Sequence, residues 1–439
     1  MGGRLAMATA GMAAAVVFAA AAAVPAPARD IPVSPAALGE VLAGARPGDR
    51  LLLAPGRYRG PLVIATAGLV LDGNGRAVID GGGRGRVITV DAPEVTLTGL
   101  VVTGSGASLP DEDSGIFLTD RATGARIVAN RLVDNLIGIN VKGAADAVVS
   151  DNTIIGRPLP RFNDRGNGIQ LWNAPGTRVE HNAVEQVRDG IFVTTSRHNV
   201  FAYNSFRRLR FAVHYMYTQD SAVIGNLSRG NHVGYALMYS YRIRAIANRS
   251  FGDRDHGLML NYVSYSEIRG NWVRDVPGKC LFFYNANINR LVGNRFEHCG
   301  IGIHFTAGSE RNVIAGNAFI ANRRQVKYVG TRYLDWSDHG RGNYWSDHPA
   351  FDIDHDGIAD APYRPNDIVD RILWSTPEAK LFLMSPAFDA LRLVASRLPP
   401  RLVGGVIDTA PLMRPPPLPE FAPVGPRGSA VAPSEGIGS

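Results

Sequence analysis

Histidine and methionine recur at matching positions in the middle of the chain, in a pattern that could bind a soft metal ion. His214 and Met216 lie two residues apart, and Met238 and Met259 follow at nearly the same positions of the next two sequence repeats. Thioether and imidazole donors together suit Cu(I) better than Zn(II), Mg(II) or Ca(II). We therefore identify His214, Met216, Met238 and Met259 as candidate Cu(I) ligands. Two alternatives are that these side chains pack under an insertion or a partner, and that they bind another ligand.

An acidic segment forms a second candidate metal site. It runs from Asp352 to Asp360 with the sequence DIDHDGIAD. Carboxylates at alternate positions, a glycine that allows a sharp turn and a free backbone carbonyl are typical of Ca²⁺ loops. Tyr363 stands where an EF-hand would have its bidentate glutamate, so we predict a single structural Ca²⁺ loop, with a metal-free acidic turn as the alternative. The expected ligands are Asp352, Asp354, Asp356, the carbonyl of Ile358, and Asp360.

A regular asparagine repeat indicates the fold that positions these residues. The asparagines follow one another at intervals of 22 or 23 residues, with one interval of 30, and short alternating runs follow each of them. A unit this short cannot bury an apolar face alone, whereas stacked units share a continuous core. We therefore predict an all-β fold, a right-handed parallel β-helix from about residue 50 to residue 322. The repeating residues are Asn130, Asn152, Asn182, Asn204, Asn226, Asn248, Asn271, Asn294 and Asn317.

The third strand of each coil gives the direction of the side chains. Counting starts at the position held by Gly190, Ala212, Gly234, Gly257, Cys280 and Gly302. The residues one and three positions further on are all apolar or aromatic, so this parity is predicted to face the core. The opposite parity then faces outward. Its two columns are Phe192, His214, Ala236, Met259, Phe282 and His304, and Thr194, Met216, Met238, Asn261, Tyr284 and Thr306.

These outward columns argue against the commonest activity of a parallel β-helix. Hydrolases and lyases that act on polysaccharides need carboxylates, or a base beside a carboxylate cluster, on the outer strand face. None of the twelve outward positions is Asp or Glu. Aromatic side chains such as Phe192, Phe282 and Trp172 would serve as a sugar platform or as a protein docking surface. The remaining catalytic candidates are Asp253, Asp255 and His256, which are also ordinary turn residues.

The chain divides into four segments. Residues 1–28 resemble a secretory signal peptide, with an apolar alanine-rich run and a small-residue cleavage site, so we expect a periplasmic protein, with a retained anchor helix as the alternative. Residues 29–330 should hold an N-terminal cap, with a helix from Pro35 to about Ala45 capped by Ser34, and then the β-helix. Residues 331–400 should form a module with the acidic loop and an amphipathic helix from Pro377 to Leu398, interrupted at Pro386. Residues 401–439 are a Pro- and Gly-rich tail, expected to be disordered from residue 411.

Charge and cysteine usage add two expectations. The formal net charge is +7, but the basic residues form no run, and export separates the protein from nucleic acid. The positive charge therefore favours acidic protein surfaces or anionic headgroups as partners. Cys280 and Cys299 are predicted to lie roughly 10 Å apart on successive coils, so we expect structural thiols, with metal ligation by one of them as the alternative.

The C-terminal module carries the most specific resemblance to a known family. The segments GNYWSD from Gly342, Asp352 to Asp360, APYR from Ala361 and LMSPA from Leu383 follow an exported β-helix. With these features the chain resembles the NosD family, periplasmic maturation proteins of nitrous oxide reductase. The resemblance implies a copper-handling accessory protein that is not an enzyme. It also implies association with an ABC-type permease and its ATPase in the inner membrane, and leaves open whether a separate copper chaperone takes part.

Overall fold

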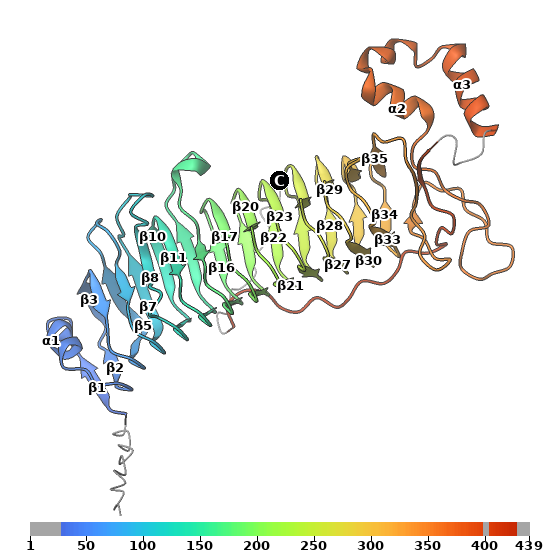
Figure 1. The fold of residues 1–439 in the computed structure, drawn as a ribbon. Coiled ribbons are helices and arrows are strands. Elements are labelled where there is room, and N and C mark those ends of the chain that lie inside the picture. Colours follow the sequence, from blue (N-terminus) through green and yellow to red (C-terminus); the bar gives the residue numbers. More distant parts are fainter. Residues whose placement is uncertain (1–27, 398–403, 428–439) are drawn as a thin grey trace, which may run out of the picture.

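The structure, a computed structural model, describes residues 28–397 and 404–427. The main body is a parallel β-helix whose coils stack along one axis, with a short capping helix at the N-terminal end and a helical subdomain at the other (Figure 1). The fold predicted from the asparagine spacing is therefore confirmed. The expected signal peptide lies outside the described residues, apart from residue 28.

One sheet of twelve strands forms a continuous wall of the β-helix. We call it sheet B. Each strand pairs in parallel with the equivalent strand of the next coil. Its strands are β4 (Leu62–Ile64), β6 (Ile88–Val90), β8 (Ser114–Leu118), β11 (Ile137–Lys142), β14 (Ile169–Trp172), β17 (Asp189–Thr194), β20 (Phe211–Met216), β23 (Val233–Met238), β26 (His256–Asn261), β29 (Lys279–Tyr284), β32 (Ile301–Phe305) and β35 (Val326–Tyr328).

Two further stacks of strands complete the coils. Together they contain 24 strands. The first begins with β1 (Asp30–Val33) and β2 (Arg50–Leu53), and two long strands, β5 (Val70–Asp80) and β7 (Thr96–Thr103), belong to both stacks. The first stack continues with β9 (Arg126–Val128), β12 (Val148–Ser150), β15 (Arg178–Glu180), β18 (Val200–Ala202), β21 (Ala222–Ile224), β24 (Arg244–Ile246), β27 (Glu267–Arg269), β30 (Arg290–Val292) and β33 (Val313–Ala315). The second contains β3 (Gly56–Arg59), β10 (Arg131–Asn135), β13 (Thr153–Gly156), β16 (Ala183–Glu185), β19 (Ser205–Arg207), β22 (Leu227–Arg229), β25 (Arg249–Phe251), β28 (Trp272–Arg274), β31 (Arg295–Glu297), β34 (Ala318–Ile320) and β37 (Tyr344–Trp345).

The repeating asparagines form a buried hydrogen-bond ladder at the corner between the first two strands of each coil. The backbone N–H of Asn204 donates to Oδ1 of Asn226 at 2.9 Å, and that of Asn226 donates to Oδ1 of Asn248 at 3.0 Å. The side-chain amide nitrogen of Asn226, Nδ2, also donates to the carbonyl oxygen of Phe201 in the preceding coil at 2.9 Å. Each asparagine thus satisfies polar groups of two coils that water cannot reach.

The ladder ends in the GNYW segment, which closes the last coil. The backbone N–H of Asn317 donates to Oδ1 of Asn343 at 3.1 Å, and the backbone N–H of Asn343 donates to the buried carboxylate of Asp408 at 2.7 Å. Asp408 also accepts from the indole of Trp345 at 2.8 Å. A Cβ atom at Gly342 would overlap the Asp408 carboxylate, so this position requires glycine. Beside this cap, β36 (Tyr333–Asp335) pairs with β38 (Gly405–Ile407).

Helices form only small parts of the described chain. The helix at the N-terminal cap, α1, covers Leu38–Ala43 and has Ala37 at its N-cap, so it is shorter than predicted and Ser34 does not cap it by its side chain. The helical subdomain contains α2 (Ile368–Ser375), η2 (Pro377–Phe382) and α3 (Pro386–Arg397). The restart at Pro386 agrees with the sequence analysis. A short η1 (Phe162–Asp164) lies in the insertion at residues 157–167, which projects from the coil (Figure 1).

The two cysteines form a disulfide, which corrects the prediction of separate thiols. The Cα atoms of Cys280 and Cys299 are 5.6 Å apart. The prediction treated both residues as extended chain, but Cys299 lies in the turn between β31 and β32, directly after His298 with its φ of 52°. The bend brings Cys299 beside Cys280 in the core, where neither is more than 3% exposed.

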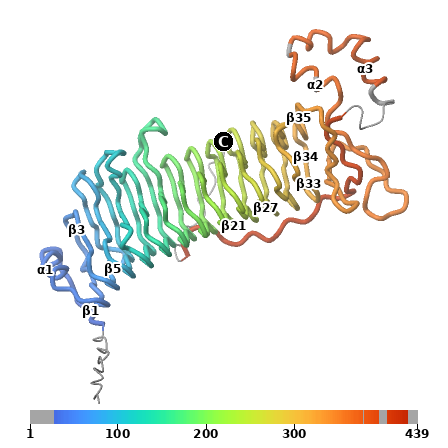
Figure 2. The backbone as a smooth tube through the Cα atoms, in the orientation of Figure 1, coloured from blue at the N-terminus to red at the C-terminus, as the bar shows by residue number. Residues whose placement is uncertain are grey.

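The expectation of a disordered tail is also wrong for residues 411–427. This segment runs back along one corner of the β-helix (Figure 2). The carbonyl oxygen of Pro419 accepts from Arg249 at 2.9 Å, and the backbone N–H of Gly425 donates to the carbonyl oxygen of Tyr203 at 2.9 Å. Proline lacks a backbone N–H, but its carbonyl oxygens accept from arginines on alternate coils, Arg249 and Arg295. Residues 428–439 lie outside the described part of the chain.

The asparagine ladder leads to a stability prediction. Asn226→Ala should lower the free energy of unfolding by about 2–4 kcal/mol, because it leaves buried backbone groups of two coils without partners. Urea unfolding followed by circular dichroism measures the change. Asn163→Ala, at an exposed position in η1, is the control and should change stability by less than about 0.5 kcal/mol. Equal effects at both positions would contradict a stabilising role for the ladder.

Candidate functional site

The strand register of sheet B confirms both outward columns. Across β20 and β23, His214 pairs with Ala236 and Met216 pairs with Met238. Across β23 and β26, Ala236 pairs with Met259. The residues of the opposite parity, such as Val213, Tyr235 and Leu258, are at most 1% exposed and form the core. His214, Met216, Met238 and Met259 therefore lie together on the outer face, and we call them the Met/His patch.

His214 is held in one orientation by a buried carboxylate. Its Nδ1 lies 3.0 Å from the carboxylate of Asp189, which also accepts from the guanidinium of Arg210 at 2.8 and 2.6 Å. Burial raises the pKa of Asp189, but His214 and Arg210 outweigh this effect and keep the pKa of Asp189 below its ordinary value. Nε2 of His214 is buried and has no hydrogen-bond partner among the described residues. A histidine oriented through one nitrogen, with the other free, is arranged as metal-ligating histidines are.

The three methionines surround a small residue next to His214. Ala236 faces outward from the coil between His214 and Met259, yet it is 0% exposed because neighbouring side chains cover it. Met216, Met238 and Met259 are each half-buried. Adjacent coils are about 4.8 Å apart and alternate residues of a strand about 6.6 Å apart, so flexible thioethers at these positions reach a common point above Ala236.

A stack of tyrosines borders the Met/His patch, and the sequence analysis did not identify it. Tyr217, Tyr239 and Tyr262 directly follow the second outward column and are 55%, 36% and 43% exposed. The rings of Tyr217 and Tyr239 stack with centroids 5.3 Å apart, and those of Tyr239 and Tyr262 with centroids 5.1 Å apart. Their spacing follows the repeat, so the periodicity contained this signal. The contact between Asp189 and His214 has no periodic signal in the sequence, because the two residues belong to different columns.

The residual catalytic candidates do not form an outward-facing group. Asp253 is 0% exposed and accepts hydrogen bonds from Ser228 at 2.7 Å, from Ser250 at 2.6 Å and from the backbone N–H of Asn231 at 2.7 Å. This is a structural role inside the coil. Asp255 lies outside the core and reaches Nδ1 of His256 at 2.9 Å. Asp253 is therefore separated from this pair.

The acidic loop brings three of its predicted ligands together. Oxygen atoms of Asp352, Asp354 and Asp356 lie within 4.8 Å of one another. The loop is held by a hydrogen bond from the backbone N–H of Gly357 to Asp352 at 3.0 Å. Asp360 instead accepts from the backbone N–H of Ile353 at 2.7 Å, and the backbone N–H of Ile358 donates to Asp356 at 2.7 Å. The carboxylate set suits a hard cation such as Ca²⁺.

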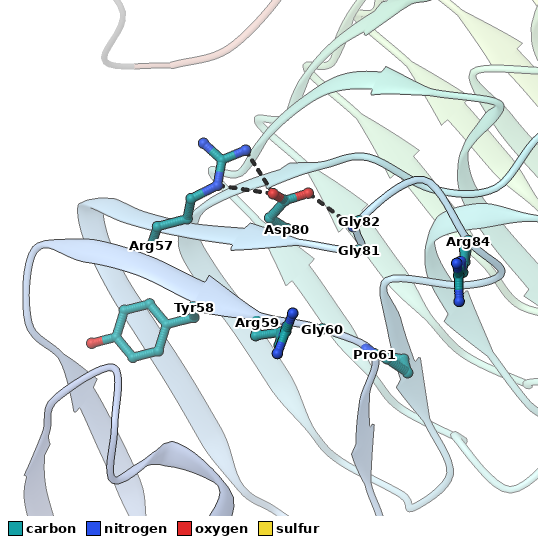
Figure 3. Close-up of a pocket in the computed structure, with 9 residues that line it drawn as sticks. All are labelled: Arg57, Tyr58, Arg59, Gly60, Pro61, Asp80, Gly81, Gly82 and Arg84. Carbon is teal, nitrogen blue, oxygen red and sulfur yellow. Dashed lines mark hydrogen bonds and ion pairs between the residues drawn. The ribbon is translucent and has the colours of Figure 1, made fainter.

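Two pockets of the structure do not coincide with the Met/His patch. An open pocket of about 640 Å³ lies at the N-terminal coils, lined in part by Arg57, Arg59 and Arg84 (Figure 3). Arg57 is paired with Asp80 at 2.6 Å. A second pocket, of about 600 Å³, lies beside the acidic loop. Neither contains a residue of the Met/His patch, which is a surface on the outer face of sheet B and not a cavity.

The fold and the site define a parallel β-helix protein that carries sulfur and imidazole donors on one sheet face. Comparison with known proteins gives its family. Residues 145–350 match the family model described as periplasmic copper-binding protein (NosD). The chain is 39% identical over 380 residues to a probable ABC transporter binding protein NosD from Stutzerimonas stutzeri, covering 83% of this chain and 87% of that protein. It is 41% identical to the protein of the same description from Pseudomonas aeruginosa, covering 84% and 89%. The chain belongs to the NosD family.

A comparison of structures gives a looser likeness. The alginate lyase AlyF-OU02 is 12% identical and superposes with a TM-score of 0.49, covering 73% of this chain and 88% of that one. At this level the likeness carries no argument about activity, whereas the NosD relatives are named as binding proteins. Along the described parts of the chain, none of the helices has the length and apolar character needed to span a bilayer.

The buried position of Asp253 leads to a prediction of pH dependence. Burial raises its pKa from 3.8 to about 6, so the folded state binds this proton more tightly than the unfolded state. Its contribution to stability is therefore fully present below about pH 4 and decreases, by at most about 3 kcal/mol, as pH rises through about 6. Asp253→Asn should remove this part of the slope. Urea unfolding at pH 4.5 and 6.5 measures it, and parallel profiles of the wild type and the variant would contradict the assignment.

Proposed function

We propose that the Met/His patch binds Cu(I) as cargo in the periplasm. The observation that carries this proposal is the free, buried Nε2 of His214, oriented by Asp189 on the same sheet face as three thioether side chains. Neutral sulfur and nitrogen donors favour Cu(I) over hard cations. The family description of a copper-binding protein supports the same cargo.

The patch is suited to transfer and not to permanent storage. Its methionines are half-buried on an outer sheet face, so a partner reaches them without unfolding a coil. The sheet backbone is fixed by pairing on both sides, and the side chains alone have to move. The tyrosine stack provides flat apolar area next to the patch, as protein docking surfaces commonly do.

We further propose that the cargo is destined for the copper centres of nitrous oxide reductase. In this role the protein associates with an inner-membrane ABC permease and its ATPase. The support is family membership and the name of the relatives as probable ABC transporter binding proteins. A carbohydrate-active role has less support, since Asp253 is buried inside the coil and none of the twelve outward positions is acidic.

The helical subdomain is our proposed contact with the membrane permease. Leu381 and Met384 are 87% and 97% exposed, and Phe382, Leu393 and Val394 are at least 57% exposed. Such a cluster of apolar side chains on one projecting subdomain is typical of a protein interaction site. The acidic loop on the same module is proposed as a structural Ca²⁺ site with Asp352, Asp354 and Asp356 as ligands.

Replacing two methionines tests the cargo site. Met216→Leu together with Met238→Leu keeps size and apolar character but removes two sulfur donors, so Cu(I) affinity should fall at least about tenfold, or about 1.4 kcal/mol. Competition titration with a chromogenic Cu(I) chelator measures the affinity. The matched control combines Met384→Leu with Met413→Leu, which lie outside the patch and should leave the affinity unchanged. An equal loss in both double variants, or none in the first, would contradict the site.

Substitution within the helical subdomain tests the docking surface. Leu381→Ser with Met384→Ser should reduce binding to vesicles that contain the co-expressed permease and ATPase at least about fivefold, because two exposed apolar contacts are lost. These substitutions are preferable to truncation after Thr376, which would also remove β38 and Asp408 from the cap. Val63→Ser, at a 62% exposed position on a distant coil, is the control. Unchanged vesicle sedimentation of the double variant would exclude this surface.

A further inference from the structure

The outward column that contains the Met/His patch continues into a basic cluster. Met259 pairs with Phe282 across β26 and β29, Phe282 pairs with His304 across β29 and β32, and His304 pairs with Lys327 across β32 and β35. Lys279 begins strand β29, and its ammonium group lies over the outward ring of Phe282. We call Lys279, His304 and Lys327 the basic cluster. It lies on the same rigid sheet as the patch.

Phe282 is the apolar centre of this region. The rings of His256 and His304 both contact it, each with a centroid distance of 5.2 Å. Nζ of Lys279 lies 5.0 Å from the centroid of the same ring. Aromatic side chains attract cations over their faces, so Phe282 holds the ammonium group near the outer surface of the sheet.

The positive charge of the cluster is not compensated. Among the described residues, neither Lys279 nor Lys327 makes an ion pair or hydrogen bond with a carboxylate, since Nζ of Lys279 contacts His256, and Nδ1 of His304 is buried without a hydrogen-bond partner. Burial, followed by Lys327 and Lys279, lowers the pKa of His304 to about 4. Burial, followed by Arg324 and Lys279, lowers the pKa of Lys327. These groups repel one another's charge, which a bound anion would relieve.

A metal ion fits this region poorly. Nε2 of His256 is already 3.2 Å from Nζ of Lys279, and its Nδ1 lies 2.9 Å from Asp255. Lys327 and Lys279 are the nearby charges that act on His304, and an ammonium group offers no lone pair to a metal. The donors here are N–H groups, which bind oxygen acceptors.

We propose that Lys279, His304 and Lys327 form a carboxylate-binding site on the outer face of sheet B. Two lysines supply charge and separate N–H donors, and the ring of His304 supplies a third donor when Nδ1 carries the proton. The short aliphatic part of an acidic side chain would lie against Phe282. The backbone of these strands is committed to the sheet ladder and offers no N–H nest for a phosphate, and Arg324, the arginine near Lys327, lies over the ring of Trp374.

The location of the site next to the Met/His patch suits it to the selection of partner proteins. One residue of the column, Phe282, separates Met259 from His304. An acidic side chain bound at the cluster would bring the remainder of its protein over the Met/His patch. The site would therefore select partners that present a carboxylate at a fixed distance from their metal-binding group. Carboxylate binding itself does not depend on the copper proposal.

Binding of an acidic peptide tests this inference. The probe is fluorescein-labelled hexaglutamate, and its fluorescence anisotropy is titrated with the copper-free full chain at low ionic strength. Lys279→Met with Lys327→Met should raise the Kd at least tenfold. The control is Arg59→Met with Arg84→Met, which removes the same charge at two exposed arginines of the N-terminal pocket (Figure 3) and should change the Kd less than threefold. Equal losses in the two variants would overturn the proposal, since they would indicate binding by net charge alone.

Further arms identify the ligand and separate this proposal from copper binding. Displacement of the peptide by sodium acetate would show that the site takes free carboxylates, and displacement only by unlabelled hexaglutamate would show that it takes acidic segments of a partner. If inorganic phosphate displaced the peptide at lower concentration than acetate or unlabelled hexaglutamate, the assignment to carboxylate would be overturned. Lys279→Gln with Lys327→Gln provides a second variant if the first fails to fold. An unchanged Cu(I) affinity in either lysine variant would show that the carboxylate site and the metal patch act independently.

Discussion

The functional arrangement of this protein depends on the fixed spacing between stacked coils. Backbone pairing holds equivalent strands about 4.8 Å apart, and the asparagine ladder keeps their corners in register. Residues a full repeat apart in sequence therefore become direct neighbours in space. Met216 and Met238 are adjacent only because their two neighbouring coils stay in register, since a slip of one coil by one residue would turn its methionine toward the core.

The same constraint separates stability from function within one coil. Inward residues of sheet B and the asparagine corners are almost completely buried, and their substitution costs stability. Outward residues of sheet B contribute little to the core, so the sheet can carry methionine, histidine, tyrosine and lysine in neighbouring columns. His214 combines the two roles, because Asp189 and Arg210 hold it firmly on a face that is otherwise open.

Periodicity explains which features could be predicted from the sequence. The asparagine spacing indicated the β-helix, and the alternation of apolar residues placed His214, Met216, Met238 and Met259 on the outer face. Contacts made in turns or between distant segments follow no period. Cys299 reaches Cys280 through a bend, and Asp408 caps Asn343 across 65 residues of sequence. The tail at residues 411–427 has a composition typical of disorder, and the sequence does not show that arginines of the coils bind its carbonyl oxygens.

The segment before α2 links the proposed permease contact to the outer face of sheet B. The side chain of Asn366, just before α2, donates to the carbonyl oxygen of Val326 in β35, the last strand of sheet B, at 2.7 Å. Arg324 lies 5.9 Å from the ring of Trp374 in α2. From β35 the outward column passes through Lys327, His304 and Phe282 to Met259. A partner bound at the proposed docking surface would be nearer to Lys327, in the last coil, than to Met259, three coils further along the column. If both proposed sites act, contacts along the column would run from carboxylate recognition to metal.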